Sequence, residues 1–119
     1  MKAELKEIVF VNPNMPNGKY SPEDEEYFGE TIYAMIGPKG EDSSDIFELF
    51  ICSPKWISKN YSNQGYIWGI NMLVLLNYNL QILEDAINKY ISPHEARDWS
   101  ELVSKIKGVG RWEFVDYQE

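Results

Sequence analysis

The strongest constraint on the fold is a pair of alternating apolar segments joined by a turn. Residues 28–36 and 46–52 both show the two-residue periodicity of β-strands. Between them lies Gly37-Pro38-Lys39-Gly40, in which proline fixes φ and the glycines permit positive φ. The pattern predicts a long β-hairpin, and we expect both faces of its second strand to be at least partly covered. The side chains on the main apolar face are Phe28, Ile32, Ala34, Ile36, Phe47, Leu49 and Ile51.

The rest of the chain alternates between strand and helix signals. Ser53-Pro54 predicts the start of a short helix that ends near Ser62. Asn79 is expected to cap a helix over 80–91 that Pro93 terminates, and Asp98 to cap a helix that stops at Gly108. The further strands are predicted at 3–11, 66–68, 72–76 (with a bulge at Gly69) and 111–117. This order indicates an α+β fold, in which a mainly antiparallel sheet with a long hairpin is packed by two to three helices.

Composition limits the class of protein further. A chain of 119 residues with 44% hydrophobic and 14% aromatic side chains predicts one folded domain over residues 1–119. Cys52 is the one cysteine, so no intrachain disulfide can form, and its apolar surroundings favour a buried, inert thiol. The N-terminal residues alternate in charge, and the longest apolar run, 72–76, is too short to cross a membrane. We expect a cytoplasmic protein with no membrane contact.

The negative charge of this chain is concentrated in one segment. Residues 20–48 hold nine carboxylates and one cation, Lys39, and nine minus one accounts for the whole formal net charge of −8. Such a field favours a basic protein surface as partner and repels nucleic acid. A solvated loop that only aids solubility is the alternative interpretation. The predicted partner-binding residues are Glu23, Asp24, Glu25, Glu26, Glu30, Glu41, Asp42 and Asp45.

Known catalytic and metal-binding patterns do not occur in the sequence. The glycines around Lys39 lack the spacing of a phosphate-binding loop, and no calcium-loop pattern is present. His94 is the one histidine and lies in a polar segment, and one cysteine with one histidine cannot form a zinc site. A pair among nineteen carboxylates will arise by chance. We therefore predict no catalytic residue, no metal and no cofactor.

Recognition of a protein is the function class that remains. Tyr20, Tyr27 and Tyr33 lie near the acidic residues and could anchor a partner, although core packing is as good an interpretation. We expect the four tryptophans, Trp56, Trp68, Trp99 and Trp112, to lie in the core. The sequence leaves open whether Glu113 and Asp116 face a partner or water. The aromatic content permits a homo-oligomer without requiring one.

Four blocks, in order, resemble the immunity protein 8 family of bacterial polymorphic toxin systems. They are residues 36–40 (IGPKG), 47–56 (FELFICSPKW), 65–69 (GYIWG) and 111–117 (RWEFVDY). The resemblance implies a small cytoplasmic α+β protein that binds and neutralises a cognate toxin encoded beside it, with no enzymatic activity. Within these blocks Gly37, Pro38, Gly40, Ser53 and Pro54 are interpreted as scaffold.

The toxin's chemistry is open at this point. If it is a nuclease with a basic groove, an acidic inhibitor could occupy that groove as a phosphate mimic. The alternatives to an immunity protein are an adaptor without a toxin partner and, with less support, a carboxylate-dependent hydrolase.

Overall fold

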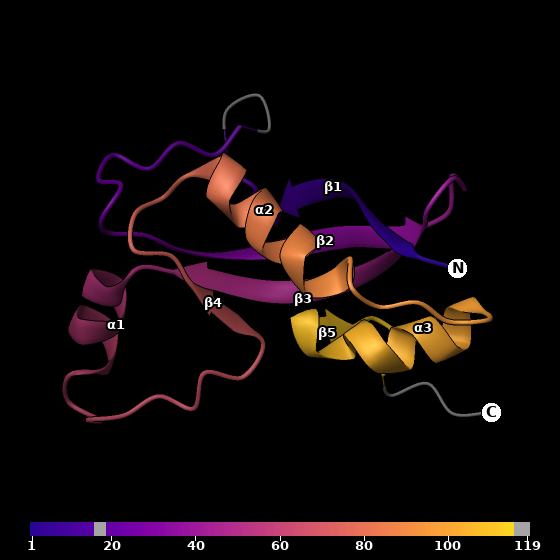
Figure 1. Cartoon of the computed structure of the whole chain (residues 1–119). Coiled ribbons are helices and arrows are strands. Elements are labelled where there is room, and N and C mark those ends of the chain that lie inside the picture. Colours follow the sequence, from indigo (N-terminus) through magenta and orange to yellow (C-terminus); the bar gives the residue numbers. More distant parts are fainter. Residues whose placement is uncertain (16–18, 116–119) are drawn as a thin grey trace.

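A five-stranded sheet organises the computed structural model of the chain, which describes residues 1–15 and 19–115 (Figure 1). The strand order is β1-β2-β3-β4, and β5 also pairs with β3. Every pairing is antiparallel except that of β4 with β3, which confirms an α+β fold with a mainly antiparallel sheet. The elements are β1 (Ala3–Phe10), β2 (Gly29–Pro38), β3 (Asp45–Cys52), α1 (Pro54–Tyr61), β4 (Met72–Val74), α2 (Leu80–Ile91), α3 (Trp99–Ile106), the 3₁₀ turn η2 (Lys107–Val109) and β5 (Arg111–Trp112).

The predicted hairpin is the centre of this sheet. β2 pairs with β3 from Gly29 opposite Cys52 to Ile36 opposite Asp45. Gly37 is required at the turn, because a Cβ there would overlap the backbone carbonyl oxygen of Ser43. Gly40 adopts φ +87°, in the left-handed region that favours glycine. The local turn chemistry thus sets the register of β2 and β3.

One face of the sheet forms the core, and helices α2 and α3 cover it (Figure 1). The seven side chains predicted for the main apolar face of the hairpin are all buried. The opposite face is partly covered, as expected. There the ring of Trp56, from α1, packs against Phe50 with centroids 4.8 Å apart, and Ile46 is half-buried.

The helices begin at the predicted caps. The Ser53 hydroxyl accepts hydrogen bonds from the backbone N–H groups of Trp56 (3.3 Å) and Phe28 (3.2 Å), so it fixes α1 to the start of β2. Asn79 caps α2 in the same way, and the Asp98 carboxylate caps α3. Each cap satisfies a backbone donor that a helix start would otherwise leave unpaired.

Four predicted strand features differ from the structure. Residues 66–68 form a loop, and β4 ends at Val74 because it pairs with only the last three residues of β3. The last strand covers Arg111–Trp112 alone among the described residues, and 116–117 lie outside them. The irregularity in strand pairing lies in β1, between Leu5 and Glu7, rather than at Gly69. β4 and β5 share one edge of β3, which leaves each little length to pair.

Candidate functional site

The predicted partner-binding residues fall into two groups at opposite ends of the hairpin. Residues 23–26 and Glu30 lie at the start of β2, on the left in Figure 1, whereas Glu41, Asp42 and Asp45 lie at the hairpin tip on the right. The seven residue steps from Gly29 to Ile36 span roughly 23 Å at ~3.3 Å per residue. The structure therefore does not bring the eight carboxylates onto a single continuous patch.

The carboxylate of Asp45 at the hairpin tip is used inside the molecule. Its Oδ2 accepts hydrogen bonds from the indole N–H groups of Trp99 (2.8 Å) and Trp112 (2.9 Å). These bonds join α3 and β5 to the start of β3. The neighbouring carbonyl of Glu41 accepts a hydrogen bond from Lys6 Nζ. Lys6 Nζ also forms an ion pair with the Glu4 carboxylate (2.6 Å), and Lys39 lies in the turn between β2 and β3.

The other acidic group is partly balanced by cations from α1. Lys55 Nζ donates to the Glu26 carboxylate at 2.6 Å, and Lys59 Nζ lies 5.3 Å from the centroid of the Tyr27 ring. The Asp24 carboxylate accepts the backbone N–H of Glu26 and so shapes the loop. The five carboxylates and these two lysines leave a net charge of −3, from −5 plus +2. This end of the hairpin remains negative.

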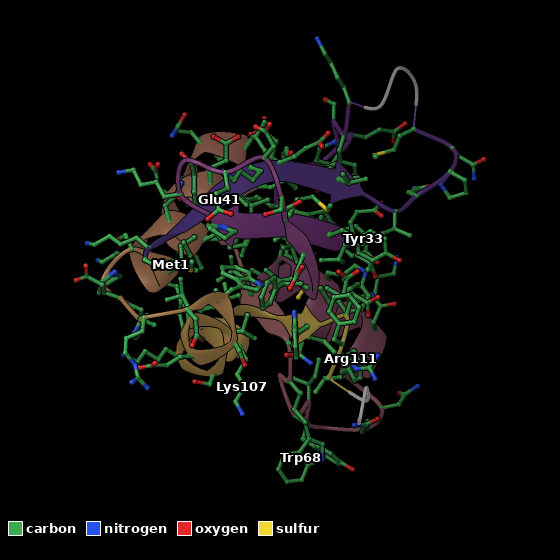
Figure 2. All side chains as sticks on the ribbon, turned by 90° about the vertical axis from the view of Figure 1, so that its right-hand side faces the viewer. Met1, Tyr33, Glu41, Trp68, Lys107 and Arg111 are labelled. Carbon is green, nitrogen blue, oxygen red and sulfur yellow. The ribbon has the colours of Figure 1, made fainter. Side chains whose placement is uncertain are left out.

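A hollow of about 430 Å³ opens at this negative end, and we call it the acidic hollow. Carboxylates and aromatic rings both line it, which fits the expectation that Tyr20 and Tyr27 lie beside the acidic residues. Tyr33 is elsewhere, on the side of the sheet away from α3 (Figure 2). The residues that line the acidic hollow are Tyr20, Pro22, Glu23, Asp24, Tyr27, Phe28, Gly29, Glu30 and Trp56.

Local packing builds the walls of the acidic hollow. Gly29 lets the Trp56 indole lie directly against the backbone, since a Cβ there would overlap the ring. Another lining residue, Tyr20, stacks on Phe10 with centroids 4.8 Å apart and meets Tyr78 edge-on at 4.9 Å. Two of the rings that line the hollow are therefore held in place by packing.

The titration of Tyr20 reports the character of the acidic hollow. Burial, reinforced by the Glu30 carboxylate and by Tyr78, raises the pKa of Tyr20 to about 12. Like that of an ordinary tyrosine, its hydroxyl is protonated at neutral pH and can donate a hydrogen bond. Carboxylates attract ammonium and guanidinium groups, and aromatic faces add cation–π attraction. This arrangement suits a lysine or arginine side chain from a partner.

The prediction that Trp68 belongs to the core is wrong. Trp68 is 81% exposed, and Ile70 (73%) and Tyr66 (60%) are exposed beside it. Figure 2 shows Trp68 projecting from the lower end of the molecule. Trp56, Trp99 and Trp112 are half-buried, closer to expectation. We call residues 65–70 the aromatic loop.

A long uncharged run in the sequence indicates the aromatic loop. Residues 60–83 contain no charged side chain, in a chain that is 25% charged. β4 uses only Met72–Val74 of this stretch in the sheet, and much of the remainder lies at the surface. An uncharged run longer than its strand can bury therefore indicates exposed apolar surface.

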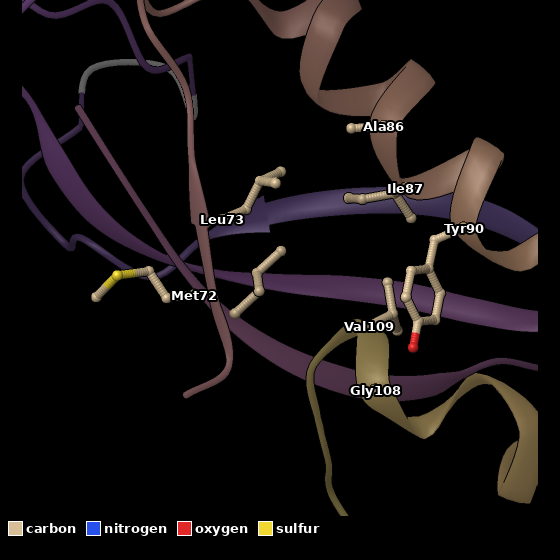
Figure 3. Close-up of a pocket in the computed structure, with 8 residues that line it drawn as sticks. Met72, Leu73, Ala86, Ile87, Tyr90, Gly108 and Val109 are labelled. Atoms are coloured by element: carbon tan, nitrogen blue, oxygen red, sulfur yellow. The ribbon is translucent and has the colours of Figure 1, made fainter. Parts of the chain in front are cut away.

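A second, apolar crevice of about 220 Å³ lies between α2, β4 and η2 (Figure 3). Leu49, Leu73, Ile87 and Val109 contribute to its walls, and Tyr90 places its hydroxyl over Gly108. Ligand sites are commonly ~300–1,000 Å³ and combine apolar walls with several converging polar groups. This crevice is smaller and mainly apolar, which is typical of an imperfectly filled gap between packed elements.

The remaining candidates for chemistry are accounted for by their surroundings. Cys52 is fully buried, as predicted, and burial raises the pKa of its thiol, which disfavours the reactive thiolate. Within residues 1–15 and 19–115, no three metal-ligating side chains gather in one place. In the same part of the chain no helix has the length and apolar character needed to cross a membrane. Glu113 is exposed, and Asp116 lies outside the described residues.

The fold and its surface define a small α+β domain with a carboxylate-rich, aromatic-walled hollow at one end of its central hairpin. The sequence model of the family described as immunity protein 8 matches residues 3–117, and the chain therefore belongs to that family. No curated protein and no solved structure matches the chain.

Proposed function

We propose that this protein binds and neutralises a cognate toxin domain in the cytoplasm without catalysing a reaction. Family membership over residues 3–117 is the observation that carries this proposal. Within it, the acidic hollow receives a lysine or arginine side chain of the toxin. Three carboxylates, from Glu23, Asp24 and Glu30, line the hollow and provide acceptors for such a group.

The charge balance favours the acidic hollow over the hairpin tip as the contact with a basic surface. Asp45 already accepts two indole N–H groups, so only Glu41 and Asp42 of the three predicted tip carboxylates are available to a partner, and Lys39 lies two residues before Glu41. At the acidic hollow, the nearby lysines leave uncompensated carboxylates. An attractive field at this end would speed association and orient the toxin.

The toxin is proposed to be a nuclease, because a nuclease groove is basic wherever it binds phosphates. The carboxylates of the acidic hollow would then occupy phosphate positions and block the substrate. This explains why an inhibitor would maintain unbalanced negative charge on one surface. A toxin of different chemistry but with a basic surface would leave the binding mode intact.

The experiment is co-expression rescue, followed by binding measurements with the purified toxin domain encoded beside this chain. The first variant neutralises two carboxylates of the acidic hollow, Glu23→Gln with Glu30→Gln. The matched control removes the same charge at the hairpin tip, Glu41→Gln with Asp42→Asn. Association rates are measured across salt concentrations.

Rescue by the wild-type chain and a roughly tenfold slower association for the hollow variant alone, with a shallower salt dependence, would support the proposal. If both variants still rescue the cell and associate with the toxin at equal rates, the acidic hollow is not part of the interface. Failure of the wild-type chain to bind or rescue would overturn toxin neutralisation itself.

A further inference from the structure

The aromatic loop exposes more apolar side chain than solubility favours. Trp68 is 81% exposed and Ile70 73%, although tryptophan is on average among the more buried residue types. Exposed apolar clusters on small soluble domains commonly mark interaction sites. Tryptophan and tyrosine are also the residues most often found at the energetic centre of protein interfaces.

The backbone holds the aromatic loop in a defined shape. Its first residue is anchored by a hydrogen bond from the Gly65 N–H to the Tyr61 carbonyl (2.9 Å), and Phe50 N donates to the Asn71 carbonyl (2.9 Å) just beyond its end. Gly65 and Gly69 adopt φ of +87° and +66°, values that other side chains rarely adopt. Both ends are therefore fixed to regular elements, and Trp68 is presented between two glycine bends.

The aromatic loop is continuous with the acidic hollow through α1. A groove of about 340 Å³ separates α1 from the loop, with Ile57 and Tyr61 on one side and Tyr66 on the other. The Tyr61 ring lies 5.9 Å from that of Trp56, which is also a wall of the acidic hollow. Figure 1 shows α1 between the aromatic loop and the segment that precedes β2, at the same end of the sheet. Charged and apolar surface thus lie on either side of α1, at one end of the molecule.

We propose that the aromatic loop is the apolar anchor of the toxin interface, with Trp68 inserting into an apolar recess on the toxin beside the basic surface that meets the acidic hollow. This inference rests on the proposed function. A second copy of this chain is a poorer occupant. Each copy carries a net charge of −8, and pairing through this face would bring two negative surfaces together.

The test measures the affinity of purified Trp68→Ala for the toxin domain encoded beside this chain. We expect at least about thirtyfold weaker binding, because truncating a central interface tryptophan removes a large desolvated contact. Trp68→Phe should restore part of the affinity. The matched control is Val9→Ala, which truncates a 38% exposed apolar side chain on β1, at the other edge of the sheet.

Thermal unfolding of each variant separates binding from folding. Since the Trp68 side chain is exposed, the melting temperature of the Trp68→Ala variant should match that of the wild type. Ile70→Ser provides a second variant, which we also expect to bind the toxin more weakly and to keep the melting temperature of the wild type. Unchanged affinity for both loop variants, in a protein whose wild type binds the toxin, would overturn the inference and leave the proposed function standing. Absence of wild-type binding would overturn both.

A homodimer is the competing outcome. If sedimentation without toxin shows the wild-type chain as a dimer and Trp68→Ala as a monomer, the aromatic loop is a self-association surface and the inference is wrong. A monomeric wild type that binds toxin through Trp68 would support it.

Discussion

The two ends of the central hairpin carry the same chemical groups and use them differently. At the tip, Asp45 is turned inward and accepts two indole N–H groups, and the Glu41 carbonyl accepts from Lys6, which also pairs with Glu4. At the start of β2, Glu23 and Glu30 line an open hollow between aromatic walls. The position of a carboxylate in a charged segment therefore does not determine its role. Its role depends on which hydrogen-bond donors other elements of the fold bring to it.

This difference also changes the meaning of the net charge. Summed along the sequence, residues 20–48 account for −8. In three dimensions, α1 brings Lys55 and Lys59 to one end of that segment, and β1 brings Lys6 to the other. The field that a partner meets is accordingly weaker and more localised than the linear count suggests.

The largest expected effect comes from breaking the inward use of a carboxylate. Asp45→Ala leaves the indoles of Trp99 and Trp112 without their acceptor. Hydrogen bonds to charged groups contribute ~1.5–3 kcal/mol each and are not additive, so we expect a loss of about 2–4 kcal/mol in unfolding free energy. Urea denaturation followed by tryptophan fluorescence measures this loss.

Asp42→Ala, at the same tip, is the control for Asp45→Ala. Its side chain is exposed, and substitutions at such positions usually stay within ~0.5 kcal/mol. Equal stability of the two variants would show that the double indole contact contributes nothing and that the two ends of the hairpin do not differ.

The second effect concerns the packing of the acidic hollow. Gly29→Ala places a methyl group where the Trp56 indole lies, and overpacking of this kind costs about 1–3 kcal/mol. In a Trp56→Ala background, Gly29→Ala should destabilise the protein much less, because the indole is gone. A double-mutant cycle by urea denaturation would measure this difference in unfolding free energy.

Gly40→Ala provides the comparison at the hairpin tip. Its Cβ would meet open space, but φ of +87° is strained for alanine, so a cost near 1 kcal/mol that is independent of Trp56 is expected. A Gly29→Ala cost that persists without the indole would contradict this explanation of the hollow.

The sequence predicted the parts of the fold that local chemistry determines. Ser53-Pro54, Asn79 and Asp98 each form the expected cap, and the alternating side chains of the hairpin are buried. The parallel pairing of β4 was not predicted, although a strand, helix and strand in succession is the usual pattern of a parallel pair.

The candidate site was only partly predictable, because its key properties depend on contacts between distant residues. The inward role of Asp45 depends on Trp99 and Trp112, more than fifty residues away. The sequence predicts a strand at 66–68 and places Trp68 in the core, but periodicity alone cannot distinguish a short apolar run of this kind from an exposed loop. The pairing of β3 with β4 and β5 leaves residues 66–68 outside the sheet.

A smaller effect is expected from the ion pair between Lys55 and Glu26. Both side chains are more than half exposed, at 61% and 55%, and solvent screens such pairs strongly. Glu26→Gln should therefore leave the urea midpoint unchanged, as should its neighbour Glu25→Gln. A clear destabilisation by Glu26→Gln alone would mean that this pair, in addition to the Ser53 cap, fixes α1 to the segment before β2.

The smallest effect at neutral pH concerns Tyr20. Its pKa is raised to about 12 in the folded protein, from an ordinary value near 10, by burial and then by Glu30 and Tyr78. A folded pKa above the unfolded one stabilises the protein fully below pH 10, and this contribution is lost as pH rises from 10 through about 12. Tyr20→Phe should make the stability less sensitive to pH in that window.

Absorbance titration of the phenolate can then distinguish the two ends of the hairpin. The difference between wild type and Tyr20→Phe isolates the titration of this one ring. Glu30→Gln should lower the pKa of Tyr20 while leaving it above 10, since burial is the larger cause. Asp42→Asn, at the opposite end, should leave it unchanged. An equal shift from both would mean that Tyr20 senses net charge alone, and that the acidic hollow has no local field to offer a cation.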